Sequence, residues 1–172
     1  MGTRGGWRRE GVSEPAWGVT VVFVLIVVFF PWEESKETAK RYACLSNVKR
    51  RALSLTMYAE DADGCFPARV RWMDATAVYL TPKALLYEGE DPHPDRSMRC
   101  PAVFKVGFGY AFNKALSGSK SPPRPESMPM VYDSTRLARN ASDLVTSLPL
   151  PGRHGGKDNV AYADGHAKAR VP

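Results

Sequence analysis

Residues 153–166 read RHGGKDNVAYADGH, and this stretch indicates the fold of the C-terminal segment. Asp164-Gly165 is a strong signal for a two-residue hairpin turn, because both residue types tolerate a positive φ. The residues on either side predict two antiparallel strands, residues 159–163 and 166–171. A hairpin of this kind is marginal alone, so we expect it to belong to a small sheet with an apolar face.

The element that covers such a sheet is predicted upstream. From residue 33 to 63 apolar side chains recur at spacings of three and four, which is typical of an amphipathic helix, and Gly64 is suited to end it. Residues 103–113 and 130–132 predict further strands. Because a narrow apolar helix stripe needs a sheet face to bury it, the sequence predicts an α+β fold. One long N-terminal helix would pack on a small antiparallel sheet within residues 66–172. The stripe consists of Leu45, Val48, Ala52, Leu55 and Ala59.

A second apolar feature precedes this helix. Residues 16–30 read AWGVTVVFVLIVVFF without a charge, and Trp17 and Trp32 bracket its apolar stretch. Arginines precede the run, which predicts a cytoplasmic N-terminus. Fifteen helical residues rise only about 22 Å against a bilayer core of about 30 Å. Three interpretations compete: a spanning anchor extended by its flanks, a cleaved secretory signal, and a buried core segment. We expect a disordered cytoplasmic segment 1–15, a transmembrane segment 16–32 and an ectodomain 33–172.

The distribution of charge bears on the expected partners, and the number of cysteines bears on the expected disulfides. The net charge of +6 is spread along the chain, so it says little about a partner. Nucleic acid is not expected as the main partner. Residues 49–51 (KRR) are the densest basic cluster and are interpreted as a solvated helix face. Three cysteines predict one disulfide and one leftover thiol if the ectodomain lies outside the cytoplasm. The pairing stays open, with Cys44–Cys100 as the candidate.

The C-terminal stretch also carries a candidate ion site. His154, Asp158, Asp164 and His166 together could hold a divalent cation if the hairpin brings them close. The alternative is structural: His154 hydrogen-bonds to backbone or to Asp164 and pins the last hairpin, with Gly155 and Gly156 supplying a sharp turn. No other cofactor is expected.

Catalysis is not expected. Ser134, His154 and Asp164 offer the residue types of a nucleophilic triad, but the chain has no G-x-S-x-G elbow. It also has no phosphate-binding glycine loop. The sequence therefore predicts a protein that is not an enzyme and takes no small-molecule substrate.

Several motifs, in order along residues 28–171, resemble the prepilin-like proteins named for a C-terminal "H-X9-DG" signature, within the type IV pilin superfamily. The signature residues are His154, Gly155, Gly156, Asp164, Gly165 and His166. The other matching segments are residues 43–49 (ACLSNVK), 63–67 (DGCFP), 99–101 (RCP), 109–113 (GYAFN) and 132–134 (YDS).

The resemblance implies a pilin-like fold and a role in assembly. It places Glu14 near the family's subunit-registering glutamate and Pro31 at the end of the hydrophobic segment. The glycine-phenylalanine cleavage junction is missing, since Arg9-Glu10 stands there.

The resemblance also implies a function. The expected protein is a structural subunit of a type II secretion or type IV pilus system in the bacterial envelope. It would be anchored in the inner membrane by a single pass, with the C-terminal domain periplasmic or extracellular. Its partners would be other pilin-like subunits or inner-membrane components of the secretion machine. The alternative is an unprocessed, membrane-tethered ectodomain that binds a divalent ion, a glycan or DNA.

Overall fold

The computed structural model describes residues 16–80, 99–103 and 105–171, with side chains from residue 34 onward. The chain divides into two compact units, Met1–Lys36 and Glu37–Pro172. The expected segment 1–15 with Glu14 lies outside the described residues, and so does the side chain of Pro31. The second unit carries the sheet and the candidate site, and the description that follows concerns this unit.

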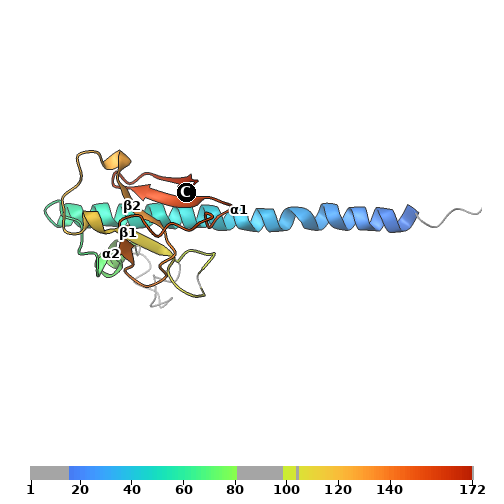
Figure 1. Ribbon diagram of the computed structural model, residues 1–172, viewed down its shortest axis with the longest axis horizontal. Coiled ribbons are helices and arrows are strands. Elements are labelled where there is room, and N and C mark those ends of the chain that lie inside the picture. Colours follow the sequence, from blue (N-terminus) through green and yellow to red (C-terminus); the bar gives the residue numbers. More distant parts are fainter. Residues whose placement is uncertain (1–15, 81–98, 104, 172) are drawn as a thin grey trace, which may run out of the picture. The chain divides into compact units, whose positions relative to one another are not determined.

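The second unit contains two helices and a five-stranded sheet (Figure 1). Its first helix belongs to α1 (Ala16–Asp61), and α2 (Trp72–Leu80) follows. The strands are β1 (Tyr110–Asn113), β2 (Pro129–Asp133), β3 (Ser142–Asp143), β4 (Asp158–Tyr162) and β5 (Ala167–Arg170). Two short 3-10 turns, η2 (Lys114–Leu116) and η3 (Pro125–Ser127), lie between β1 and β2. The strand order is β3-β1-β2-β4-β5.

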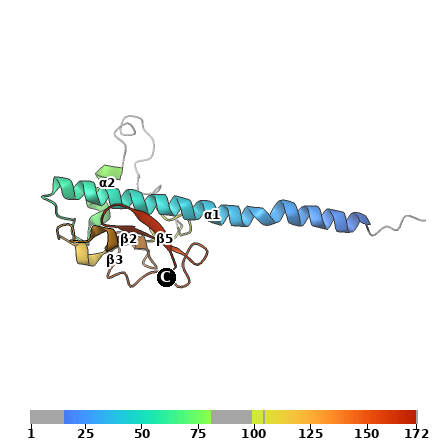
Figure 2. The same cartoon turned by 90° about the horizontal axis from the view of Figure 1, so that it is seen from above.

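One face of the sheet is covered by α1 (Figure 2). The buried stripe of α1 starts at Cys44 and continues through Val48, Ala52, Leu55 and Ala59. These side chains share one core with sheet residues such as Phe112, Val131 and Ala161. A smaller apolar cluster that includes Tyr132, Val160 and Tyr162 forms a second buried group.

The C-terminal hairpin is confirmed. β4 pairs antiparallel with β5, with Ala161 opposite Ala167. Gly165 has a φ of +88°, a conformation that costs little only for glycine. The turn closes with a hydrogen bond from the Gly165 N–H to the Tyr162 oxygen at 2.9 Å.

The expected pilin-like fold, a membrane-plus-amphipathic helix on an antiparallel sheet, is wrong. The sheet is mixed, since β3 pairs parallel with β1. The physical reason lies in the segment before β3: the Phe112 N–H and the Trp72 Nε1 both donate to the Ala141 oxygen, which holds that segment against the outer edge of β1. In addition, none of the helices within the described part of the chain is long and apolar enough to cross a membrane.

Candidate metal centre

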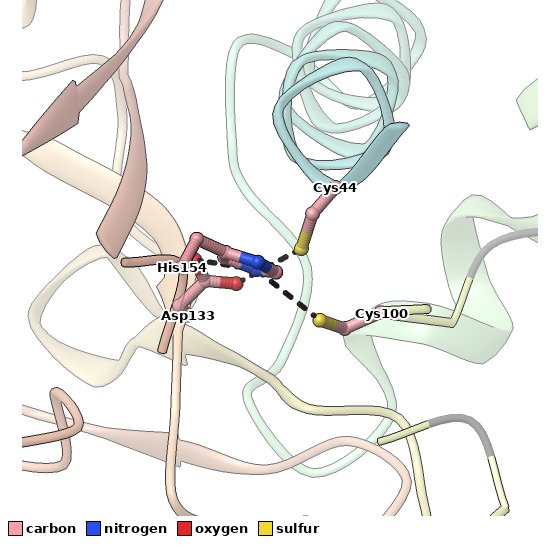
Figure 3. Close-up of side chains that lie close together, drawn as sticks. All are labelled: Cys44, Cys100, Asp133 and His154. Atoms are coloured by element: carbon pink, nitrogen blue, oxygen red, sulfur yellow. Dashed lines mark hydrogen bonds and ion pairs between the residues drawn. The ribbon is translucent and has the colours of Figure 1, made fainter. Parts of the chain in front are cut away.

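Four side chains from four separate segments meet between α1 and the sheet: Cys44, Cys100, Asp133 and His154 (Figure 3). One potential ligand atom from each of them lies within 4.8 Å of all the others. All four residues are buried, and none is more than 2% exposed. Two thiols, an imidazole and a carboxyl group at this separation are the ingredients of a transition-metal site.

Local structure explains why each side chain points inward. Cys44 begins the sheet-facing stripe of α1, and Asp133 is the last residue of β2. Cys100 lies just before a turn that returns toward β1, where its N–H donates to the Phe108 oxygen at 3.0 Å. His154 sits in a tight turn before β4, where its N–H donates to the Lys157 oxygen at 2.9 Å.

The contacts inside the cluster have the spacing of a coordination shell. The Cys44 thiol donates to Asp133 Oδ1 at 3.1 Å, and Cys100 Sγ lies 3.5 Å from His154 Nε2. His154 Nε2 is 3.6 Å from Asp133 Oδ2. Zinc bonds these ligand types at about 2.0–2.3 Å, which places neighbouring ligands of a tetrahedron about 3.3–3.8 Å apart. A zinc-sized ion therefore fits with small side-chain movements.

Arg153 supplies the positive charge beside the cluster. Its Nη1 donates to the Gly109 oxygen at 2.8 Å and lies 3.8 Å from Asp133 Oδ1, and Nη2 donates to the Ser134 oxygen. Gly109 permits this approach, because a Cβ there would lie 2.9 Å from Arg153 Nη1 and 3.1 Å from Cys100 Cβ. Two thiolates, one carboxylate, one divalent ion and this guanidinium sum to zero, which lowers the cost of burying them together.

Burial and mutual contacts shift the acid–base equilibria of the cluster. Burial raises the pKa of Cys44, while the hydrogen bond from Cys44 and then that with His154 lower the pKa of Cys100. Burial also raises the pKa of Asp133 to about 6. Burial alone would lower the pKa of His154, but the contact with Cys100 and the charge of Asp133 outweigh it, so this pKa is raised. Without an ion the cluster therefore retains protons that a metal must displace.

The other residues of the predicted ion site lie elsewhere. Asp158 is buried in β4 and accepts the Arg153 N–H at 2.9 Å, and it is not among the four converging side chains. Asp164 and His166 contact each other at 2.6 Å at the hairpin tip, where both are partly exposed. The structure thus brings only His154 of that set to the cluster. Gly155 and Gly156, with φ of +64° and +77°, form the turn behind it.

The structure leaves Cys44, Cys65 and Cys100 unlinked. The candidate disulfide partners Cys44 and Cys100 do lie together, and each contacts a further potential ligand, Asp133 or His154. Sequence reasoning missed Asp133. It had two signals: its place at the end of the short strand that includes residues 130–132, and its position within the matching segment 132–134 (YDS).

Comparisons of this chain with protein-family models, with curated proteins and with solved structures find no match. The geometry of the cluster is therefore the basis for the function proposed next.

Proposed function

We propose that the unit from Glu37 to Pro172 is a non-catalytic module that binds one zinc-like divalent ion through Cys44, Cys100, Asp133 and His154. The observation that carries this proposal is the convergence of four buried ligand atoms within 4.8 Å of one another. Buried polar groups are costly unless they are paired or bind an ion, so four of them in one place favour a site that an ion completes.

The ligand set selects the class of ion. Calcium and magnesium prefer shells made of oxygen, whereas thiolates select softer ions such as zinc. Four protein ligands also complete a tetrahedron, which is typical of structural zinc sites, while catalytic zinc sites keep one position open. The nearly complete burial of all four residues supports the same choice.

The proposed ion acts as a clasp between parts of the fold. It would join Cys44 of α1 to Asp133 at the end of β2 and to two loops that carry Cys100 and His154. An ion that binds only the folded state stabilises that state by about 4 kcal/mol when its free concentration is 1,000 times its Kd. Chelators would thus lower the stability of the folded module, and zinc would raise it.

Metal analysis of the full-length chain tests the proposal. The chain is purified, stripped with a chelator and refilled with zinc or with cobalt(II), whose visible spectrum reports tetrahedral thiolate coordination. We expect one ion per chain, with loss of binding in Cys44→Ser and in His154→Gln. Cys65→Ser is the matched control, because Cys65 lies outside the cluster. Equal loss in Cys65→Ser, or a preference for calcium over zinc, would show that the proposal is wrong.

A second candidate function follows from the surface of α1. We propose that the module also serves as a structural subunit of a bacterial envelope assembly, as the sequence motifs indicate, partnered by related subunits. Tyr42, Leu53 and Met57 are large apolar side chains that are 60%, 44% and 46% exposed. Their spacings of 11 and 4 residues place them on one side of the helix, which supports a packing surface.

Cross-linking in intact cells tests this second function. Leu53→Glu places a charge in the middle of the packing surface, so cross-linked species above the monomer should decrease. Val78→Glu is the control, since Val78 is also open to solvent but belongs to α2 and not to α1. An unchanged cross-linking pattern in Leu53→Glu would argue against assembly through α1.

A further inference from the structure

The two sulfur atoms of the cluster can enter a second chemical state. Cys44 Sγ and Cys100 Sγ belong to the group whose ligand atoms lie within 4.8 Å of one another, and no disulfide links them. A disulfide requires an S–S distance of about 2.05 Å, so the sulfurs need to approach each other by less than about 3 Å. A disulfide sulfur is no longer a thiolate, so it loses its value as a zinc ligand. Metal binding and disulfide formation therefore exclude each other.

Burial restricts which oxidants reach these sulfurs. Cys44 and Cys100 are both 0% exposed, whereas Cys65 is partly exposed. A protein disulfide or an aromatic disulfide reagent must bring a bulky sulfur in line with the attacking one, and the folded unit leaves no room for that. Hydrogen peroxide is scarcely larger than water and needs only a brief local opening. The geometry therefore favours a small peroxide over thiol–disulfide exchange.

The surroundings of the two sulfurs differ in the ion-free fold, which is the state that forms once a local opening has loosened the ion, and they suggest an order of events. Cys44 donates its proton to Asp133 Oδ1 at 3.1 Å and contacts the Tyr110 hydroxyl at 3.1 Å. Cys100 instead lies beside the His154 imidazole. Cys100 is thus the sulfur placed to react with peroxide, and Cys44 is the neighbour placed to complete the disulfide.

We propose that hydrogen peroxide converts the metal-bound cysteine pair into a Cys44–Cys100 disulfide and thereby releases the ion, an inference that rests on the proposed metal-binding function. Cys100 sulfur attacks one peroxide oxygen, the O–O bond breaks, and a sulfenic acid and hydroxide form. Cys44 sulfur then attacks the sulfenic sulfur, which forms the S–S bond and expels a second hydroxide. Two protons convert both hydroxides to water, so two thiolates lose two electrons and one peroxide gains them.

Oxidation would change the kind of bond that connects α1 to the Cys100 loop, and the connection itself would remain. In the metal-bound state the ion connects α1 to the loops that carry Cys100 and His154 and to Asp133. In the oxidised state a covalent bond connects α1 to the Cys100 loop, while Asp133 and His154 are no longer joined through an ion. The helix would stay attached to the sheet in both states, and only the metal would be exchanged with the surroundings.

The experiment uses the zinc-loaded full-length chain, treated with hydrogen peroxide in the presence of a chromogenic zinc chelator. We expect one zinc released per chain and one Cys44–Cys100 linkage in the peptide map, both reversed by a thiol reductant and added zinc. Cys65→Ser should behave like the wild type. Release of zinc with over-oxidised cysteines and no disulfide, a linkage through Cys65, or retention of zinc would each overturn the inference.

The two proposals fail in different ways in this experiment. A chain that binds no zinc before peroxide is added refutes the proposed function and the linked release together. A chain that binds zinc but forms no Cys44–Cys100 disulfide refutes only the redox inference and leaves the metal site standing.

Discussion

Replacing Asp133 by asparagine should make the metal-free protein more stable and the zinc-loaded protein less stable than the wild type. Asp133 is 0% exposed, and burial raises its pKa from 3.8 to about 6. At about 1.4 kcal/mol for each pKa unit, the ionised carboxylate costs the folded, metal-free protein about 3 kcal/mol. Asparagine has nearly the same shape and no charge, so it removes this cost.

The sign of the pH dependence follows from the direction of the shift. The folded protein holds the Asp133 proton more tightly than the unfolded chain does, so this group favours folding below about pH 4. That contribution is lost as the pH rises through about 6. Asp133→Asn should therefore match the wild type at pH 4 and exceed it at pH 8. We expect a gain of about 1–3 kcal/mol at pH 8, because the variant also loses the attraction to Arg153 at 3.8 Å.

Zinc should invert this order. At 1,000 times its Kd the ion adds about 4 kcal/mol to the wild type, which for a unit of this size corresponds to a Tm increase of about 12 °C. Asp133→Asn lacks the anionic oxygen ligand and should gain only a small part of this. Thermal unfolding of both proteins at pH 8, with zinc and with chelator, measures all four values.

Asp143→Asn is the matched control. Asp143 is also buried, and although burial opposes it, hydrogen bonds from Ser147 and from Tyr132 at 2.7 Å keep its pKa low. Asparagine should therefore destabilise the protein at this position and leave the zinc response unchanged. The reasoning on Asp133 is refuted if Asp133→Asn retains the full zinc-dependent increase in Tm, or if it lowers the stability of the metal-free protein at pH 8.

Three shorter predictions concern pH, a buried indole and the hairpin turn. The zinc-dependent increase in Tm should shrink as the pH falls through about 6, where protons compete with the ion for Asp133, and a pH series of melting curves measures this. Trp72→Phe removes the hydrogen bond from Nε1 to the Ala141 oxygen at 3.0 Å and leaves a buried acceptor with one partner fewer, so urea unfolding should show a loss of about 1–3 kcal/mol. Gly165→Ala places a Cβ at a φ of +88° and 3.1 Å from the Leu53 side chain, which should cost about 1–2 kcal/mol in the same assay while zinc binding persists.

Local patterns predicted the elements that depend on neighbours in the sequence. The Asp164-Gly165 pair predicted the turn between β4 and β5, and the spacing of apolar residues predicted the buried stripe of α1. These features follow from backbone preference and from the period of side-chain burial, both of which can be read from a short window.

Contacts between segments that are far apart in the sequence could not be predicted from such local patterns. β3 has only two residues, so it carries no alternation of its own, and its parallel pairing with β1 depends on contacts made by Trp72 and Ala141. Arg51 was expected on a solvated face, yet it is fully buried against the rings of Trp72 and Tyr110. A cation in a basic run gives no sequence signal that two aromatic rings will cover it.

The candidate site shows the same limit. The predicted ligands were gathered from residues 154–166 because they are neighbours in the sequence, and only His154 belongs to the cluster. Cys44 and Cys100 were paired for a different reason, as a disulfide. Asp133 became visible only when β2 was placed beside the stripe of α1, since a single aspartate at a strand end is a common surface residue.

The order in which the four ligands occur along the chain has a consequence for biosynthesis. Cys44 lies in α1 and His154 just before β4, so the proposed coordination shell can form only after synthesis has passed His154. Bringing Cys44 and His154 to the same ion closes a long loop. The conformational entropy lost in this closure must be offset by the bonds to the ion. A nascent or truncated chain that ends before His154 would bind an ion only weakly. Its incompletely folded segments would be accessible to proteases. In the proposed metal-bound protein, zinc occupancy would thus report that synthesis has reached β4.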